Sequence, residues 1–305
     1  MANLMQRNFI YFINPISGTK NKTALVDYIQ LQTSIQNISY QILDTNKEGN
    51  YQYLPEKIKD EHITDIIVCG GDGTVSQIAS FLLGCDVNIG IIPMGSGNGL
   101  AFAASINTNY KKALKIAFEG NAKYIDGFTF NEKFGCMLAG VGFDAKVAHD
   151  FSLQKKRGLF TYLLLCIKNF FSIKPYSFKL NIDNKQFETE ALFISVANSN
   201  QFGNHVTIAP KASLSDGLLD VVIVNRMNKL LTMFSLLRQI SLGKIQSQKN
   251  LTQKHSGIEY FHCEKITIHN QSNAPLHLDG EPISSSSTIE IKIIPKAFRL
   301  LQPVS

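Results

Sequence analysis

The chain has 305 residues, of which 44% are hydrophobic and 18% are charged, and its formal net charge is +6. This composition excludes a disordered chain and allows two globular domains of ordinary size. The positive charge is spread along the sequence without a basic array interleaved with aromatic residues, so we expect no nucleic-acid partner.

The sequence also indicates a compartment. Its five cysteines lie far apart and form no C-x-x-C pair, which fits a reducing cytoplasm. Residues 1–7 lack the pattern of a signal peptide, and no stretch reaches the roughly 18 apolar residues of a membrane span. We therefore expect a cytoplasmic protein, whose contact with a membrane would be peripheral, at the inner face.

The first 125 residues alternate between the two kinds of element. Apolar runs predict strands at 9–13, 39–43, 63–69 and 87–92, and periodic runs predict helices at 23–33, 51–59, 75–82, 100–104 and 110–119. This alternation predicts an α/β domain over residues 1–125, with a parallel sheet and helices on both faces. Such sheets bind ligands at the carboxyl ends of their strands.

Three turns rich in Gly, Ser and Asn follow predicted strands, at residues 14–18, 70–74 and 95–99. In the central turn, Gly70, Gly71 and Gly73 lie where a strand passes into a helix, which favours a bound phosphate. A carboxylate there, Asp72, suits a site where Mg²⁺ or a proton lies between it and the phosphate. The other interpretation is an ordinary turn in which Asp72 caps a helix.

Strands dominate from residue 126 onward. They are predicted at 128–130, 134–139, 176–182, 187–198, 219–224, 265–269 and 289–294, which indicates an antiparallel β-sandwich over residues 126–295. Gly/Asp turns are predicted at 140–145, at 213–221 and at 279–281. Two apolar helices, 159–173 and 229–242, either cover the core, line an acceptor pocket or rest on a bilayer, with the basic cluster 155–157 facing anionic headgroups.

Six motifs occur in series over residues 9–295, nearly the whole chain. They are Asn14-Pro15-x-Ser17-Gly18, Gly70-Gly71-Asp72-Gly73-Thr74, Pro93-x-Gly95-Ser96-x-Asn98, Gly140-x-Gly142-x-Asp144-Ala145, Asp216-Gly217-x-x-Asp220 and Asp279-Gly280-Glu281. Together they resemble the lipid kinases of the diacylglycerol kinase and sphingosine kinase superfamily, in its compact bacterial form. The second motif alone is shared with NAD kinases.

The resemblance implies a nucleotide-binding α/β domain, residues 1–125 with a return of 296–305, and a β-sandwich acceptor domain, residues 126–295. ATP is expected in the cleft between them, with Mg²⁺. The residues implied for nucleotide and its metal are Asn14, Pro15, Ser17, Gly18, Thr45, Gly70, Gly71, Asp72, Gly73, Thr74, Ser96 and Asn98.

A second set is implied in the β domain. Ser213, Asp216 and Leu218 match a structural Mg²⁺ site, the outer two through backbone carbonyls. Glu281 matches the catalytic base, with Asp72 assisting directly or through metal. A carboxylate can accept the proton of an acceptor hydroxyl, and metal can bridge phosphate oxygens.

The chain departs from many bacterial relatives at two positions, with Ser96 in place of Thr and Gly99 in place of Asp. This leaves the acceptor open between diacylglycerol and a sphingoid base. Two alternatives also remain, a soluble-substrate kinase of the NAD kinase type and a catalytically silent nucleotide- or lipid-binding module. The sequence is compatible with a homodimer.

Overall fold

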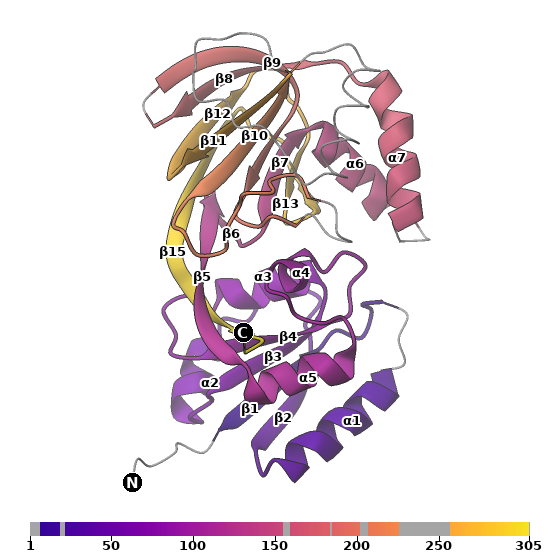
Figure 1. Ribbon diagram of the computed structural model, residues 1–305, viewed down its shortest axis with the longest axis vertical. Helices are drawn as coiled ribbons and strands as arrows, with labels where there is room; N and C mark the ends of the chain where they lie inside the picture. Colours follow the sequence, from indigo (N-terminus) through magenta and orange to yellow (C-terminus); the bar gives the residue numbers. More distant parts are fainter. Residues whose placement is uncertain are drawn as a thin grey trace. The chain divides into compact units, whose positions relative to one another are not determined.

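The computed structural model describes residues 7–18, 22–154, 159–183, 185–201, 207–225 and 257–304. The basic cluster 155–157 and the helix expected at 229–242 lie outside these ranges. The chain divides into two compact units, Met1–Ile125 with Lys296–Ser305 (unit 1) and Asp126–Pro295 (unit 2). Strands β5 and β15 each run from one unit into the other (Figure 1).

Unit 1 is built on a parallel sheet in the order β2-β1-β3-β4-β15. Its strands are β1 (Asn8–Ile13), β2 (Ser39–Asp44), β3 (Asp65–Gly70), β4 (Asn88–Pro93) and the end of β15 (Thr288–Gln302). Its helices are α1 (Lys22–Ile35), α2 (Leu54–Asp60), α3 (Asp72–Ser80), α4 (Gly99–Ala103) and α5 (Tyr110–Glu119). The predicted α/β class is confirmed.

The central strands are buried along their whole length. In β1, residues 9–13 are all buried, and every residue of β3 is buried too. A strand buried on both faces needs a continuous apolar run, which is why β1 and β3 could be found from sequence. The first residue of each strand is polar. Asn8 of β1 is partly buried, whereas Asp65 of β3 is completely buried.

Two element boundaries in unit 1 differ from the predicted ones. Helix α3 begins at Asp72 and not at residue 75, because Gly71 is extended (φ −98°, ψ −178°) and the chain turns into the helix immediately after it. Strand β15 continues to Gln302, whereas residue 294 was the predicted end, because Arg299 and Leu300 pair with β4.

Unit 2 is antiparallel throughout its described pairings, in the order β14-β13-β7-β9-β8-β12-β15, with β10 joining β9 to β11 and β6 pairing with β5. The strands are β5 (Asn121–Phe130), β6 (Lys133–Gly135), β7 (Leu138–Gly142), β8 (Tyr176–Ile182), β9 (Lys185–Ala197), β10 (Leu219–Asn225), β11 (Ile258–Cys263), β12 (Lys265–Asn270), β13 (Leu276–Leu278) and β14 (Glu281–Ile283). In the described part of unit 2 these strands are accompanied by α6 (Phe143–Ser152) and α7 (Leu159–Ser172).

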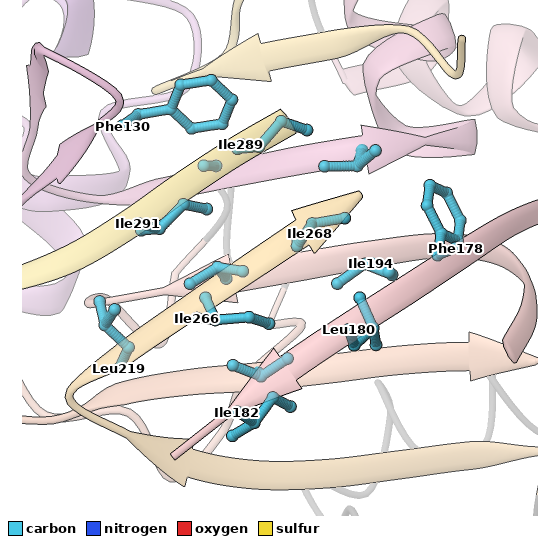
Figure 2. Packing of buried hydrophobic residues seen from close by; sticks show 14 of the residues in the cluster. Phe130, Phe178, Leu180, Ile182, Ile194, Leu219, Ile266, Ile268, Ile289 and Ile291 are labelled. Carbon is cyan, nitrogen blue, oxygen red and sulfur yellow. The ribbon is translucent and has the colours of Figure 1, made fainter. Parts of the chain in front are cut away.

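The core of unit 2 lies between these strands. Figure 2 shows Phe178, Leu180 and Ile194 meeting Ile266 and Ile268, and all five side chains are completely buried. Alternate residues of β8 and β12 supply these contacts, as expected where one face of each strand turns inward. The predicted sandwich-like second domain is confirmed.

The prediction of a turn at residues 140–145 was wrong. Gly140 and Val141 lie within the buried strand β7, paired with β9 and β13, and α6 begins at Phe143. Gly140 makes room for neighbouring side chains and does not form a loop, since a Cβ on it would overlap the side chains of Asp144 and His277. Only Gly142, at φ +107°, needs a conformation that disfavours other residues.

Asp65 is the buried charge on which unit 1 depends. Its Oδ1 accepts hydrogen bonds from Arg7 Nη2 (2.6 Å) and Asn88 Nδ2 (3.0 Å), and its Oδ2 accepts from Arg7 Nε (3.0 Å) and the Thr64 hydroxyl (2.6 Å). These bonds join β1, β3 and β4 at their amino ends. A buried carboxylate is tolerated only with such partners.

We therefore expect Asp65→Ala to lower the free energy of unfolding by about 3 kcal/mol, because it removes the carboxylate partner of Arg7 and leaves the guanidinium with the carbonyls of Ala117 and Phe118 as acceptors. Urea unfolding would measure this. The matched control is Asp86→Ala, which breaks the Asp86–Arg299 pair of the same unit, whose carboxylate side is 93% exposed. The control should lose less than about 1 kcal/mol, and equal losses in both variants would contradict the assignment.

Candidate functional site

Three turns lie together at the carboxyl edge of the parallel sheet. They follow β1, β3 and β4, and backbone hydrogen bonds join them in pairs. Asn14 N donates to the Cys69 carbonyl (3.0 Å), and Met94 N donates to the Gly70 carbonyl (2.8 Å). Because the strands are parallel, all three chains turn at the same edge. The structure thus brings together the first, second and third motifs of the sequence.

Glycines allow this approach. A Cβ placed on Gly95 would lie 2.6 Å from the Gly71 Cα, a distance that no real side chain tolerates. Gly18, at φ +61°, approaches the Met94 carbonyl so closely that a Cβ would overlap its oxygen. At these positions the backbones of two turns are in direct contact, which a side chain at either glycine would prevent.

Two asparagines fix the shape of the turns. Asn14 Nδ2 donates to the Thr74 hydroxyl (2.8 Å), and Asn14 Oδ1 accepts from Ile16 N (3.1 Å), so its amide ties the first turn to the second. Asn98, buried and left-handed at φ +52°, closes its own turn through Gly95 N (2.9 Å) and Gly95 O (2.8 Å). The Asn14 amide is therefore held by backbone and by the side chain of Thr74, and the Asn98 amide is held by the backbone of Gly95.

Asp72 links the second turn to the third. Its Oδ2 accepts from Gly99 N (2.9 Å) and its Oδ1 accepts from Leu100 N (3.2 Å), at the beginning of α4. Asp72 belongs to α3, but its carboxylate caps the amino end of α4. A carboxylate is also a hard oxygen donor of the kind that Mg²⁺ takes as a ligand. Gly99, the first residue of α4, supplies the first of the two N–H groups.

The remaining predicted residues of unit 1 lie around the same edge. Ser17 Oγ donates to the Asn14 carbonyl (3.2 Å), and Thr45 N, just past the end of β2, donates to the Ile13 carbonyl (2.9 Å). Pro15 and Ser96 are exposed in their turns, and Gly73 lies in the first turn of α3.

One residue of this edge was missed from the sequence. Lys22 begins α1, and its Nζ donates to the Ser17 carbonyl and lies 3.9 Å from the Met94 sulfur. It therefore places a positive charge beside the first and third turns. Its only signal in the sequence is that a lysine follows the first turn by four residues, a spacing too common to be informative.

The edge favours an anion. The first N–H groups of any helix lack partners within the helix, and Gly71, the residue before α3, has no side chain to cap them. The helix dipole adds about half a positive charge at this end, and Lys22 adds a full one. Burial raises the pKa of the nearby Cys69 thiol well above its usual range, so that thiol stays neutral beside the turns.

In unit 2, Glu281 follows a turn that is fixed by hydrogen bonds to the backbone of residues 136–138. Asp279, buried and left-handed at φ +48°, accepts from Cys136 N, Met137 N and Leu138 N, each at 2.9 Å. Gly280 follows at φ +84°, and Glu281 then begins β14 with its side chain exposed. Asp279 therefore fixes the turn, and Glu281 projects from it into solvent.

A chain of hydrogen bonds joins this turn to the loop that holds the predicted metal residues. Gly217 N donates to Asp126 Oδ2 (2.7 Å), and Asn198 Nδ2 donates to the carbonyls of Asp126 (2.9 Å) and Cys136 (3.0 Å). Cys136 N donates in turn to Asp279. Asp126 and Asn198 are buried and were missed from the sequence, because their role depends on contacts between distant segments.

Around that loop, Asp216 is exposed and its Oδ1 accepts from Leu218 N (3.2 Å). Ser213 is partly buried, and its hydroxyl accepts from Ser215 N (3.4 Å). One carboxylate and two backbone carbonyls are all hard oxygen donors, which suits Mg²⁺, an ion that keeps several of its waters. Within the described ranges, no three acidic, His or Cys side chains gather as a metal cluster.

Asp220, the last residue of that motif, is buried behind the loop. Its Oδ1 accepts from the Tyr260 hydroxyl and lies 3.2 Å from His262 Nδ1. Burial raises the pKa of the Asp220 carboxyl, and burial together with this hydrogen bond raises the pKa of the Tyr260 hydroxyl. Asp220 therefore supports β10 and β11 rather than facing a ligand.

The fourth motif packs against the sixth. Asp144 Oδ2 lies 3.4 Å from His277 Nε2, and both side chains are buried. Gly280 N donates to His277 Nδ1 (3.3 Å), so this nitrogen carries no proton and Nε2–H faces Asp144. Gly140 leaves the space for this pair. The pair connects α6 to the turn that precedes Glu281.

The comparisons with known proteins cover both units. Residues 8–130 match the diacylglycerol kinase catalytic domain, and residues 137–302, more than half of the chain, match the YegS C-terminal NAD kinase beta sandwich-like domain. The chain belongs to the diacylglycerol kinase family of lipid kinases. A phosphotransferase activity accounts for a sheet edge that favours an anion.

Individual relatives agree with this family. The probable lipid kinase YegS of Salmonella arizonae is 27% identical over 275 residues, which cover 88% of each chain. A YegS-like probable lipid kinase of Citrobacter koseri is 28% identical over 267 residues, or 85% of each chain. A crystal structure of a diacylglycerol kinase from Bacillus anthracis shares the fold, with a TM-score of 0.72 at 20% identity over 97% of each chain.

For this kinase we expect Gly95→Ala to weaken ATP binding at least tenfold, because its Cβ must push the third turn away from Gly71. Calorimetric titration with ATP would measure the affinity. The control is Gly84→Ala, at φ +78° with open space around it, which costs backbone strain without separating turns. Unchanged ATP affinity in Gly95→Ala, or an equal loss in the control, would show that the contact between the turns does not shape the site.

Proposed function

We propose that the chain transfers the γ-phosphate of ATP to a hydroxyl of a membrane lipid, of the diacylglycerol or sphingoid-base class. The observation that supports this most is the contact between the three glycine-containing turns at the carboxyl edge of the unit 1 sheet. Their backbone N–H groups, the start of α3 and Lys22 together suit a polyphosphate.

The roles of the unit 1 residues follow from this geometry. The backbone of Gly70, Gly71, Gly73 and Thr74 would donate to phosphate oxygens, and Gly18 permits a close approach. Asn14 and Asn98 would hold the first and third turns in shape. Ser17, Thr45 and Ser96 would offer hydroxyl groups at the rim, beside Pro15.

Asp72 would hold Mg²⁺, which would supply positive charge against the phosphates. The donor fits, since Mg²⁺ takes carboxylate oxygens as ligands, and this carboxylate lies where the second and third turns meet. The hydrogen bonds from Gly99 and Leu100 fix its orientation. Ser213, Asp216 and Leu218 would hold a second, structural Mg²⁺ in unit 2.

Glu281 would accept the proton of the acceptor hydroxyl. It is exposed, and the bonds of Asp279 to the backbone of residues 136–138 keep its turn in place. A positioned base of this kind contributes about 10²–10⁴-fold to a rate. The loose transition state of phosphoryl transfer leaves the larger share to positioning and charge stabilisation.

We expect Glu281→Gln to lower kcat by about 10²–10⁴-fold, because it removes the proton acceptor, while the affinity for ATP stays unchanged. Transfer of label from ATP to mixed-lipid vesicles would measure turnover. Glu264→Gln replaces an exposed glutamate elsewhere in unit 2 and serves as the control. Near-normal turnover in Glu281→Gln would exclude Glu281 as the base.

The same assay separates the competing functions. Label in the lipid phase supports the proposal, and the panel of lipids then identifies the acceptor. Label in added NAD would support a soluble-substrate kinase, and label in neither would support a silent binding module. The acidic groups that a silent module would be free to lose, Asp72, Asp216 and Glu281, are all present.

A further inference from the structure

A two-residue turn joins β13 to β14 and leads directly into Glu281. Leu278 pairs with Glu281 across the hairpin, and the residues between them, Asp279 and Gly280, are both left-handed, at φ +48° and φ +84°. A type I′ turn requires positive φ at both of its central residues, and Asp-Gly is one of the sequences that favour it. The position of Glu281 therefore depends on how firmly this turn is held.

Each of the two turn residues is fixed by one side chain. The Asp279 carboxylate accepts from the backbone of residues 136–138. Gly280 N donates to Nδ1 of His277 (3.3 Å), a residue of β13 that is completely buried. The second bond holds the turn from the buried side of the hairpin, immediately before Glu281.

The bond from Gly280 depends on which nitrogen of His277 carries the proton. A neutral imidazole has one N–H donor and one acceptor nitrogen, so Nδ1 accepts only while the proton is on Nε2. Nε2 lies 3.4 Å from Oδ2 of Asp144, on α6. A carboxylate beside one ring nitrogen favours the proton there and leaves the other nitrogen as the acceptor. Asp144 therefore selects the tautomer that can hold Gly280.

Asp144 is itself held in place. Its Oδ1 accepts from Ala145 N (2.8 Å) in the first turn of α6, where the helix dipole favours a negative charge. A Cβ on Gly140 would overlap both Asp144 Oδ2 and His277 Nε2, so this glycine keeps open the space in which the two side chains meet. Helix α6 contacts β13 and β14 (Figure 1), which keeps the carboxylate against the hairpin.

Two further titratable side chains near Asp144, both on α7, are neutral. They are Tyr162 and Cys166. Burial raises the pKa of the Cys166 thiol to about 12 and raises the pKa of the Tyr162 hydroxyl well above its usual range. Both groups therefore keep their protons at neutral pH, and the charge that faces His277 Nε2 comes from Asp144.

We propose that Asp144 and His277 are positioning residues for phosphoryl transfer, which fix the turn before Glu281 so that its carboxylate is held where it meets the acceptor hydroxyl. The inference rests on the proposed function, in which Glu281 accepts the hydroxyl proton. A base must lie within about 3 Å of the group that it deprotonates, and a displacement of about 1 Å can lower a rate about 100-fold. The competing role is stability alone, in which the pair only helps unit 2 to fold.

Asp144→Asn tests the tautomer. Ala145 N requires an oxygen at Oδ1, so the new amide nitrogen takes the place of Oδ2 and donates to His277 Nε2. The imidazole proton then moves from Nε2 to Nδ1, and Gly280 N loses its acceptor. Correlation NMR spectra of isotope-labelled imidazoles report this move without any turnover, and the signals of His277 are those absent from His277→Asn.

Turnover of vesicle lipid tests the positioning. We expect Asp144→Asn to lower kcat about tenfold or more, with the KM values for ATP and for lipid changed less than about twofold, because Glu281 is displaced while both substrates still bind. His277→Asn should stay within about threefold of the wild type, since its Oδ1 is an acceptor for Gly280 N that has no tautomer. Adding Asp144→Asn to it should then have no further effect.

The control is Asp150→Asn, which removes a carboxylate of the same helix that accepts from Lys146 instead, and it should turn over as the wild type does. An unmoved proton in Asp144→Asn, or a moved proton with unchanged kcat, would overturn the proposal. Equal losses of kcat in Asp144→Asn and the control would do the same. Should Asp144→Asn unfold by circular dichroism, His277→Asn is compared with His277→Leu, which offers no acceptor, and equal turnover in these two would overturn the proposal.

The double variant Asp144→Asn/Glu281→Gln separates this proposal from the proposed function. Once the base is gone, Asp144→Asn should cause no further loss of the residual turnover. A further loss of about tenfold would overturn the proposal and leave the base role of Glu281 intact. Near-normal turnover in Glu281→Gln alone would remove both the base and the proposal, and absence of turnover on every acceptor by the wild type would count against the proposed function itself.

Discussion

The close approach of Gly71 and Gly95 is the constraint on which the edge formed by the three turns of unit 1 depends. With no Cβ between them, the turns after β3 and β4 touch backbone to backbone, and Asp72 can reach the start of α4. The first turn joins them through Asn14, whose amide bonds to Thr74. A parallel sheet alone would bring the strand ends to one edge, but the glycines let the turns themselves come into contact.

In unit 2, a network of buried polar side chains, and not contacts between glycines, connects the turn of Glu281 to other segments. Asp279, Asn198 and Asp126 hydrogen-bond to backbone groups from distant segments, which links the turn of Glu281 to the loop of Gly217. Hydrogen bonds in a buried network are stronger than in water. They therefore help to hold the turn from which the exposed Glu281 projects.

Much of the fold could be predicted because its signals are local. Buried apolar runs indicated β1 and β3, and the order of the motifs indicated the family. The turn predicted around Gly140 was wrong, because a glycine that makes room for Asp144 and His277 looks the same in sequence as a glycine in a loop. The roles of Lys22 and of the Asp126–Asn198 link could not be found, since both depend on contacts across long sequence separations.

Amide hydrogen exchange with and without Mg²⁺-ATP tests the central claim most directly. If the three turns form one phosphate-binding edge, ATP will slow exchange at residues 14–18, 70–74 and 94–99 together, and Gly95→Ala will weaken all three effects. Protection at only one of these turns, or protection confined to other parts of the chain, would contradict a shared edge.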